Sequence, residues 1–375
     1  MLASIRGGWY KPKPVRRVEI PKPDGGKRNL GVPTVIDRMI QQAIAQVLEA
    51  IFEPLFSENS YGFRSGRNAH QAIKKAEDYY KQGYIRVVDI DLAKYFDTVN
   101  HDILINRLRK EVKGEAVISL IRKFLKSGVM INGIVSTTQE GTPQGGNLSP
   151  LLSNIYLAAF DQMLESRGHK FVRYADDCNI YVKSQRAAER VMTSCTKYLE
   201  DKLKLKVNQE KSKAGSPLRL KFLGFSLYKI GKRTGIRPHG KPMERFKKKI
   251  RQLTSRKQAK PISEILKNIR NYTIGWLGYY SIANMSSRIN TLNEWIRRRI
   301  RQIFWKQWKK PSARFENLKR LGIPKGKAWE WANSRLGYWR IADSWILHRS
   351  LTNEYLASIG YDDMAQRYEA LHSNY

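Results

Sequence analysis

The sequence predicts an α+β fold followed by an all-helical region, and three observations lead to this prediction. Before His239, strand-like apolar segments alternate with segments of helical periodicity. Two of these strand-like segments carry pairs of aspartates. After His239 the strand pattern ends, and residues 239–310 contain 19 Lys and Arg but three acidic residues.

Local patterns predict where the elements lie. Residues 9–34 alternate basic and apolar positions around a Pro-Asp-Gly turn, which indicates a hairpin. Ser149 and Pro150 follow a glycine-rich loop and are typical of a helix N-cap and first turn. Helices are expected at 34–56, 68–82, 100–112, 115–125, 149–166, 186–203, 241–257, 261–280 and 286–308 and again beyond 311, and strands at 85–92, 133–138, 170–184, 203–213 and 218–228.

The net charge of +36, from 69 Lys and Arg against 33 Asp and Glu, predicts a polyanionic partner. Basic side chains that neutralise phosphates release condensed counterions, which favours association. A ribosome-like structural protein or a merely solvated basic surface is the alternative. The two cysteines, Cys178 and Cys195, have no histidines at zinc-ligand spacing, so neither a disulfide scaffold nor structural zinc is expected.

Neither a signal peptide nor a membrane span is expected. The sequence has no run of about 18 apolar residues, and its start turns polar and basic early. We therefore expect a soluble, intracellular protein that makes no contact with a membrane.

The aspartates give the strongest local signal. Asp176 and Asp177 are adjacent at a tight turn between two apolar strands, where like charges repel and ionisation is costly without a cation. Asp89 and Asp91 share one face of another strand. If the two strands are neighbours, Asp91 and Asp176 can hold two Mg²⁺ ions about 4 Å apart, as nucleotidyl transfer requires. An ordinary exposed turn is the alternative.

An ordered series of motifs resembles group II intron-encoded reverse transcriptase/maturases, from about Arg16 to the C-terminus. GWLGYY and EWIRRRIR resemble the thumb or maturase region less specifically. The series consists of PKPDGGKRNLGVP, YGFRSGRN, DIDLAKYFD, GTPQGGNLSPLL, YADD, LKVNQEKS and FLGF.

The resemblance implies a right-hand polymerase whose palm has an antiparallel sheet, followed by a helical thumb/maturase domain. It implies fingers at 1–84, shortened at the N-terminus, and a palm at 85–235. The thumb/maturase domain is expected at 239–310 and a small helical C-terminal domain at 311–375.

The same resemblance implies the catalytic residues. Asp91, Asp176 and Asp177 would be the metal ligands, and Asp89 would have a structural or supporting role. Tyr95, four positions after Asp91, would exclude a ribose 2′-hydroxyl, although an aromatic residue there is equally typical of a core. A further expected residue is Lys211, which would protonate the leaving pyrophosphate unless it is an ordinary surface lysine.

Residues that bind nucleotide, primer and RNA are also implied. An ordinary structural role is the alternative for several of them: a solvated basic hairpin for Lys22 and Arg28, and an ordinary turn for Gln144 and Gly145. For the two basic clusters the alternative is a solvated helix face, because three consecutive residues of a helix cannot all face one partner. The expected residues are Lys22, Arg28, Gln144 and Gly145 for the incoming dNTP, Tyr174, Leu223 and Gly224 for the primer, and Lys247, Lys248, Lys249, Arg297, Arg298 and Arg299 for RNA.

The expected function is RNA-directed DNA synthesis. Two Mg²⁺ ions, or Mn²⁺ as a substitute, would assist addition of dNTPs to the 3′-hydroxyl of a DNA or RNA primer on an RNA template. Binding of group II intron RNA, to assist splicing and retromobility, is expected in addition. The alternatives are a splicing maturase with little polymerase activity and a reverse transcriptase of retron, diversity-generating or defence type.

Two departures from the family pattern limit these expectations. The family's N-terminal extension has no counterpart here, which puts template capture and template switching in doubt. No histidine-asparagine-histidine endonuclease motif follows the helical region, so cleavage of the second DNA strand is not expected. The bacterial cytoplasm or nucleoid is the expected location.

Overall fold

The computed structural model describes residues 1–21, 25–131, 134–136, 140–142 and 145–373, which form two compact units. Unit 1 comprises Met1–Leu223 and unit 2 comprises Gly224–Tyr375. The predicted fingers and most of the predicted palm therefore lie in unit 1, whereas residues 224–235 of the predicted palm lie in unit 2. Strands β9 (Phe225–Ile230) and β10 (Arg233–Pro238) form a hairpin that belongs to unit 2.

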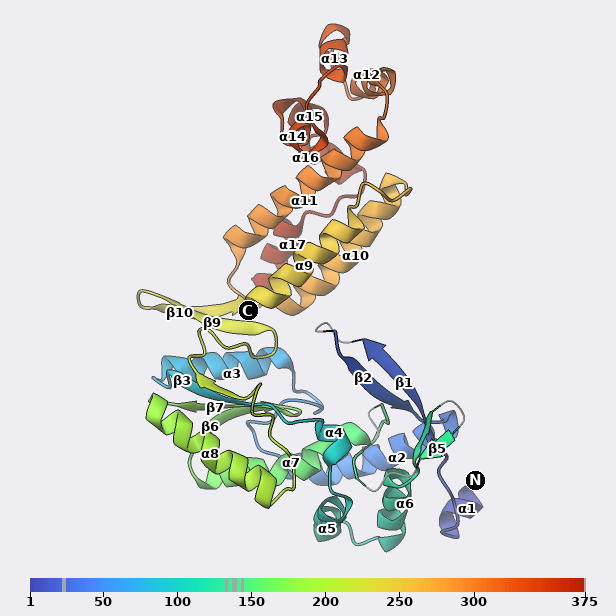
Figure 1. Cartoon of the computed structure of the whole chain (residues 1–375), viewed down its shortest axis with the longest axis vertical. Coiled ribbons are helices and arrows are strands. Elements are labelled where there is room, and N and C mark those ends of the chain that lie inside the picture. The colour runs from blue at the N-terminus through green and yellow to red at the C-terminus, as the bar shows by residue number, and fades with distance from the viewer. Residues whose placement is uncertain (22–24, 132–133, 137–139, 143–144, 374–375) are drawn as a thin grey trace. The chain divides into compact units, whose positions relative to one another are not determined.

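The central sheet of unit 1 has four strands in the order β6-β7-β3-β8, and every neighbouring pair is antiparallel. Helix α3 packs on one face of this sheet, and α7 and α8 cover the other (Figure 1). Alternate side chains of β7, among them Ile180, point into the buried core with α7 and α8. These elements are β3 (Arg86–Ile90), β6 (Lys170–Tyr174), β7 (Asp177–Val182), β8 (Lys213–Gly215), α3 (Ala69–Lys81), α7 (Ser149–Ser166) and α8 (Gln185–Asp201).

A second sheet of unit 1 has the order β2-β1-β4-β5. The predicted hairpin of residues 9–34 forms β1 and β2, and the unpredicted strand β4 runs parallel to β1. Thr34 caps helix α2 by accepting a hydrogen bond from the Asp37 amide. The elements are α1 (Leu2–Arg6), β1 (Val15–Pro21), β2 (Lys27–Val32), α2 (Val35–Phe52), η1 (Glu53–Leu55), α4 (Tyr95–Thr98), α5 (His101–Glu111), α6 (Glu115–Leu125), β4 (Val129–Ile131) and β5 (Ile134–Ser136).

Unit 2 is helical after its hairpin, as predicted. Helix α11 is its longest element, and α17 packs against both α10 and α11. None of the described helices is long and apolar enough to cross a membrane. The elements are α9 (Gly240–Leu253), α10 (Ile262–Tyr280), α11 (Ser286–Gln307), α12 (Pro311–Arg320), α13 (Lys325–Ala332), α14 (Tyr338–Ile341), α15 (Trp345–Ser350), α16 (Asn353–Ser358) and α17 (Met364–His372).

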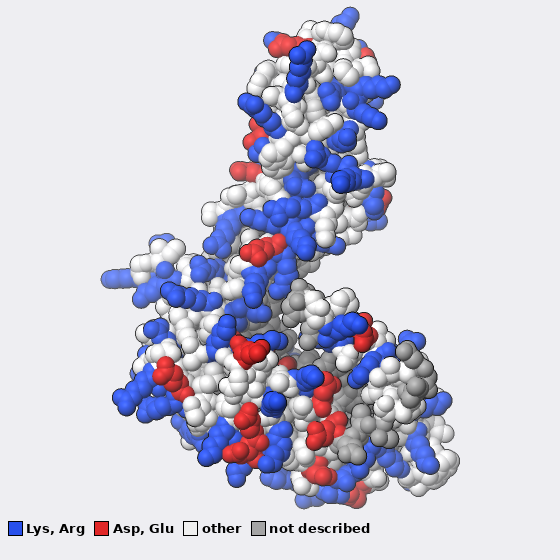
Figure 2. Space-filling model, viewed as in Figure 1, with Lys and Arg blue, Asp and Glu red and all other residues white. Residues whose placement is uncertain are grey.

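Basic side chains dominate the visible surface of unit 2. Figure 2 shows Lys and Arg over much of this face, with few acidic side chains between them. The distribution agrees with the predicted polyanionic partner.

Candidate active site

Strand pairing in the central sheet brings the predicted catalytic carboxylates to one place. Ile90 of β3 is paired with Cys178 of β7, so the next step of the antiparallel register sets Asp91 opposite Asp177. Asp176 occupies the turn between β6 and β7, after Ala175. Asp91 and the adjacent pair Asp176 and Asp177, which come from two separate segments of the sequence, therefore lie at the same end of the sheet.

The NQEKS segment fixes the backbone of Asp91. The Asp91 amide donates to Ser212 Oγ at 3.0 Å, and the Asn208 amide donates to the Asp91 carbonyl at 2.8 Å. Lys211 lies in the same loop, but its side chain is exposed and, among the described residues, has no hydrogen bond or ion pair to the carboxylates. The segment thus holds Asp91, and the predicted general-acid role of Lys211 stays a prediction.

A fully buried arginine holds the turn that carries Asp176. Arg173 is 0% exposed and makes a bidentate pair with Asp161, at 2.7 and 2.6 Å. Its Nη1 also donates to Asn154 Oδ1 at 2.9 Å and to the Ala175 carbonyl at 2.8 Å. Ala175 has a φ of 57°, which is left-handed and unfavourable for a residue with a Cβ. The network stabilises this turn.

A glycine from a distant motif completes this network. Asn154 Nδ2 donates to the Gly62 carbonyl at 2.8 Å, and a Cβ on Gly62 would lie 2.2 Å from the Ala175 nitrogen. Only glycine fits there. The Arg173 network was not predicted from the sequence, although an arginine within the apolar strand FVRY was a visible signal.

Burial and mutual repulsion shift the pKa values of the carboxylates upward. Burial, followed by repulsion from Asp177 and Asp91, raises the pKa of Asp89 to about 7. Burial, followed by repulsion from Asp176, raises the pKa of Asp177 to about 6, and burial also raises the pKa of Asp176. The Asp177 side chain reaches the surface, whereas Asp89 lies deeper, and the pKa of Asp89 is raised further.

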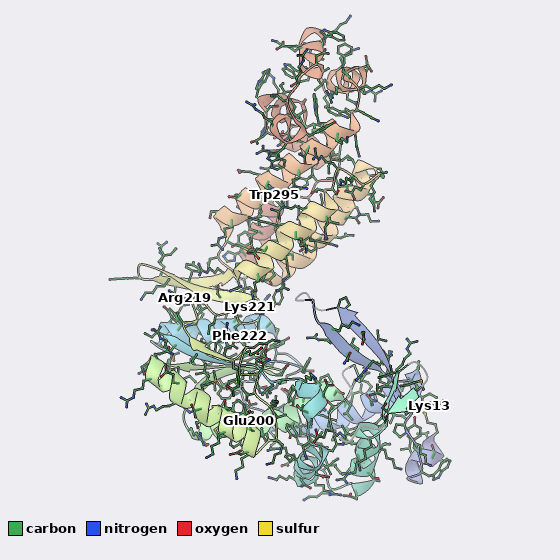
Figure 3. All side chains as sticks on the ribbon, viewed as in Figure 1. Lys13, Glu200, Arg219, Lys221, Phe222 and Trp295 are labelled. Atoms are coloured by element: carbon green, nitrogen blue, oxygen red, sulfur yellow. The ribbon has the colours of Figure 1, made fainter. Side chains whose placement is uncertain are left out.

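Neighbouring cations, among them Arg28 and Lys221, oppose these shifts. The positive charge of Arg28 on β2 lowers the pKa of Asp176, in keeping with its predicted place beside the reacting phosphates. Lys221, in the segment just before β9, lowers the pKa values of Asp89 and Asp177 (Figure 3). Sequence reasoning missed Lys221 because it stands among several basic residues without a motif of its own.

The donor set suits a hard divalent cation, but its side chains do not converge. In the part of the chain that the structure describes, no three acidic, histidine or cysteine side chains come close enough to share a metal ion. Carboxylate oxygens are the ligands that Mg²⁺ and Mn²⁺ prefer, and a cation would relieve the repulsion that raises these pKa values. The residues therefore fit the implied metal in chemistry.

We predict that Asp89→Asn stabilises unit 1 at pH 8 and has little effect near pH 4. The pKa of Asp89 is raised from 3.8 to about 7 in the folded state, so between these two pH values the folded chain holds a proton that unfolding releases. The free energy of unfolding therefore falls as the pH rises through this range. This rise corresponds to at most about 4 kcal/mol, and we expect about 1 to 3 kcal/mol after solvent screening. Thermal unfolding of both proteins in EDTA checks this difference. An equal difference at both pH values contradicts it.

Comparison with known proteins identifies the family. Residues 20–227 match the family model described as "Reverse transcriptase (RNA-dependent DNA polymerase)". The chain belongs to this family. Residues 243–322 match the "Group II intron, maturase-specific domain". The predicted resemblance to group II intron reverse transcriptase/maturases is thereby confirmed.

Relatives and a solved structure agree with this assignment. Over 56% of this chain, the sequence is 36% identical to Protein YkfC of Escherichia coli. Over 46% of this chain, it is 41% identical to the group II intron-encoded protein LtrA of Lactococcus lactis. These alignments span 65% of YkfC and 29% of LtrA. The telomerase of Candida albicans has 12% identity and a TM-score of 0.51, covering 100% of this chain and 66% of that one. It confirms the right-hand polymerase fold alone.

In this member of the reverse transcriptase family, the structure contradicts the predicted position of Tyr95. The side chain is 2% exposed and its hydroxyl donates to the Ser153 carbonyl at 3.0 Å. A ring held in the core cannot meet the sugar of a nucleotide. Phe96, the next residue, is half-buried and packs edge-on against the Tyr95 ring.

Phe96 lines a cavity of about 190 Å³ between the second sheet and α4. Neighbours of predicted nucleotide-site residues also line this cavity: Asn29, Leu30 and Gly31 follow Arg28 on β2, and Thr142 belongs to the GTPQGG motif. The lining also contains the carboxylates of Asp97 and Glu140. The Thr142 hydroxyl is buried, and no hydrogen-bond partner for it occurs among the described residues. Phe96, and not Tyr95, is therefore the aromatic residue of this pair that reaches the cavity.

The remaining nucleotide and primer predictions have different outcomes. Lys22 and Gln144 lie outside the described residues. Gly145 has a φ of 111°, and a Cβ there would lie 2.9 Å from the Gly31 carbonyl, so this motif does require glycine. Tyr174 is paired with Asp177 at the catalytic turn.

Leu223 and Gly224 stand at the junction of the two units. Both have left-handed backbones, with φ values of 49° and 84°. Within unit 2, a Cβ on Gly224 would lie 2.6 Å from Tyr280 Oη. Their predicted contact with the primer stays a prediction.

The two basic clusters predicted to bind RNA differ in the structure. Lys247, Lys248 and Lys249 on α9 are exposed and, among the described residues, have no ion pair. By contrast, the three arginines of α11 are half-buried and each has a partner within unit 2, so their predicted contact with RNA stays a prediction. Arg297 pairs with Asp363 at 3.1 Å, Arg298 pairs with Asp343 at 2.8 Å, and Arg299 donates to Thr254 Oγ1 at 2.5 Å.

Proposed function

We propose that this chain adds deoxynucleotides to a primer 3′-hydroxyl on an RNA template. The observation that supports this activity is the meeting of Asp91, Asp176 and Asp177 at one sheet edge, with raised pKa values at Asp176 and Asp177. Two bound Mg²⁺ ions would supply Lewis-acid activation of the attacking and leaving oxygens.

The chain's own residues would orient the reactants. Arg28, whose charge acts on Asp176, would hold the triphosphate and offset the negative charge that develops on it. The Ser212 and Asn208 hydrogen bonds would keep Asp91 in place, and the Arg173 network would keep Asp176 in place.

Incorporation of labelled dTTP on a poly(rA)/oligo(dT) hybrid tests the polymerase proposal. We expect extension that requires Mg²⁺ or Mn²⁺ and stops in EDTA. A purified chain that binds the hybrid and gives no extension with either cation would leave the splicing-maturase alternative as the better proposal.

We predict that Phe96→Ala, and not Tyr95→Ala, admits ribonucleotides. Removing the half-buried Phe96 ring opens the side of the proposed sugar site, whereas Tyr95→Ala leaves a core cavity and costs about 3 to 5 kcal/mol of stability. Single-nucleotide addition with dNTP and NTP gives the selectivity of each variant, and thermal unfolding gives its stability. A folded Tyr95→Ala enzyme that loses selectivity while Phe96→Ala retains it would reverse the assignment.

The maturase-specific segment supports a second activity. We propose that unit 2 binds group II intron RNA and thereby assists splicing and retromobility in the cytoplasm or nucleoid of a bacterium. The match over residues 243–322 favours this activity over a retron or defence role. The exposed lysines of α9 are among the cations of unit 2 that an RNA partner could reach.

We predict that the two basic clusters respond differently to substitution. Replacing Lys247, Lys248 and Lys249 by Gln should reduce the slope of log affinity against log salt by about 0.7 to 0.9 for each lost RNA contact. Replacing Arg297, Arg298 and Arg299 by Gln should instead lower the thermal stability of unit 2. Their partners Asp363, Asp343 and Thr254 would lose the guanidinium groups that they now bind. Salt titration of RNA binding and thermal unfolding separate the two effects. An unchanged slope in the lysine variant would make α9 a solvated face.

A further inference from the structure

A basic cavity lies at the end of the β6–β7 hairpin that is remote from the catalytic turn. Tyr174 is paired with Asp177 at the turn, and Lys170 is paired with Tyr181 at the other end. A strand advances about 3.3 Å per residue, so Lys183 lies about 20 Å along β7 from Asp177. The cavity is therefore separate from the carboxylates.

The cavity has a volume of about 420 Å³ and a cationic lining. Lys170, Lys183 and Arg190 contribute to it, and no Asp or Glu is among its lining residues. None of these three cations forms an ion pair within the part of the chain that the structure describes. A volume of this size lies within the usual range of small-ligand sites, about 300 to 1,000 Å³.

Neutral and aromatic groups complete the cavity. Lys183 Nζ lies 5.5 Å from the centroid of the Tyr84 ring, which also lines the cavity. At its rim, the Arg167 guanidinium donates to Ser194 Oγ at 2.5 Å. Burial, followed by the neighbouring charge of Arg167, lowers the pKa of His169, so its imidazole is neutral at physiological pH and can donate one hydrogen bond.

The grouping of these cations favours an anionic ligand. The three positive charges around this cavity repel one another. Solubility does not require such a cluster, because a surface on which positive and negative side chains are mixed is also soluble. An anion in the cavity would offset this repulsion and could accept hydrogen bonds from Lys and Arg together. A polynucleotide fits better than a small anion because the cations are exposed at an open rim, where a polyanion also gains from counterion release.

We propose that this cavity binds a backbone phosphate of RNA, as a contact site on the central sheet separate from the polymerase carboxylates. The inference rests on the proposed function, in which RNA is the chain's partner. RNA held there keeps its contact while the carboxylates act on a different segment of nucleic acid.

The test compares two variants of the full chain that lose the same charge. The cavity variant carries Lys170→Gln, Lys183→Gln and Arg190→Gln. The control carries Lys110→Gln, Lys113→Gln and Lys202→Gln, which replace exposed lysines of unit 1 outside the cavity lining. Binding of a fluorescein-labelled, structured RNA is measured from low to high KCl. Single-nucleotide addition is measured at saturating primer-template.

The cavity variant should show a salt slope smaller by about 0.7 to 0.9 for each lost phosphate contact, and the control should keep the slope of the unchanged chain. Nucleotide addition should remain unchanged in both. Equal slopes in the two variants overturn the proposal. A second result would also overturn the proposal: inorganic phosphate stabilises the unchanged chain but not the cavity variant, and the salt slope of RNA binding is the same in both. The cavity would then bind a free anion.

Failure of this inference can be distinguished from failure of the proposed RNA-binding function. If the α9 lysine variant weakens RNA binding and the cavity variant does not, unit 2 binds RNA and the cavity does not. If the unchanged chain has no salt-dependent affinity for RNA, both proposals fail.

Discussion

Replacing Asp176 by Asn should abolish DNA synthesis and leave RNA affinity close to that of the unchanged chain. Asn has nearly the same size but offers a neutral amide in place of a carboxylate that would bind the cation. A metal contributes several kcal/mol to the transition state, and about 4 kcal/mol corresponds to about a thousandfold in rate. RNA affinity should hold because the change removes a negative charge from a chain of net charge +36.

Primer extension and RNA binding are measured on the same preparation of the Asp176→Asn protein. Asp201→Asn is the matched control, because Asp201 is an exposed residue at the end of α8. The control should retain full activity. Extension by Asp176→Asn above a few per cent of the unchanged rate would remove Asp176 from the catalytic site.

The elements with strong periodicity could be predicted from the sequence. The helix from Val35 to Phe52 and the helix from Ser149 to Ser166 lie where the spacing of apolar residues indicates. The predicted N-cap Ser149 is wrong by one residue, because Leu148 is the N-cap and Ser149 is the first residue of the helix. The antiparallel meeting of the Asp91 strand with the Asp177 strand was also predictable, since both strands are apolar and both carry acids that need a common cation. Strand β4 was missed because its residues Val129, Met130 and Ile131 are all apolar and show no alternation of apolar and polar positions.

The position of Tyr95 could not be found by counting along the chain. Lys94 has a left-handed backbone, with φ 49° and ψ 41°, and begins the one-turn helix α4. This reversal turns the Tyr95 side chain into the core and leaves Phe96 at the cavity. The family resemblance gave Tyr95 by its spacing from Asp91, and spacing alone does not show which of two adjacent aromatic rings faces the core.

The arginines of α11 show a second limit of sequence reasoning. Charge density indicates a polyanion, but it cannot distinguish a free cation from one with a distant partner. Asp363 lies 66 residues after Arg297, and their pairing exists because the C-terminal helices return to α11. Such long-range pairs are visible only in the fold. The Arg173 network was missed for the same reason.

Breaking the Arg173 network should separate stability from catalysis. Arg173→Met leaves the Asp161 carboxylate buried without a partner, which should cost about 3 to 5 kcal/mol. The double variant Arg173→Met, Asp161→Leu replaces the whole ion pair by apolar groups, and buried pairs replaced in this way lose little stability. We therefore expect the double variant to be about as stable as the unchanged chain.

Activity should not return with stability in the double variant. The Ala175 carbonyl would still lack the donor that holds the left-handed turn before Asp176. Loss of a group that orients a metal ligand typically lowers metal affinity or activity about 10- to 100-fold. We expect a lower kcat, a higher Mg²⁺ concentration at half-maximal rate and little change in the KM for primer-template.

Arg301→Met is the matched control for loss of a buried arginine. Arg301 is buried in unit 2, where it donates to the Leu351 carbonyl at 2.9 Å, and it belongs to neither the carboxylate site nor the turn. This variant should lower thermal stability without changing the Mg²⁺ dependence of kcat. If the Arg173→Met, Asp161→Leu variant were stable and showed the unchanged kcat and Mg²⁺ dependence, Arg173 would serve folding alone. A shifted Mg²⁺ dependence in that variant, absent from Arg301→Met, would assign Arg173 the role of positioning Asp176.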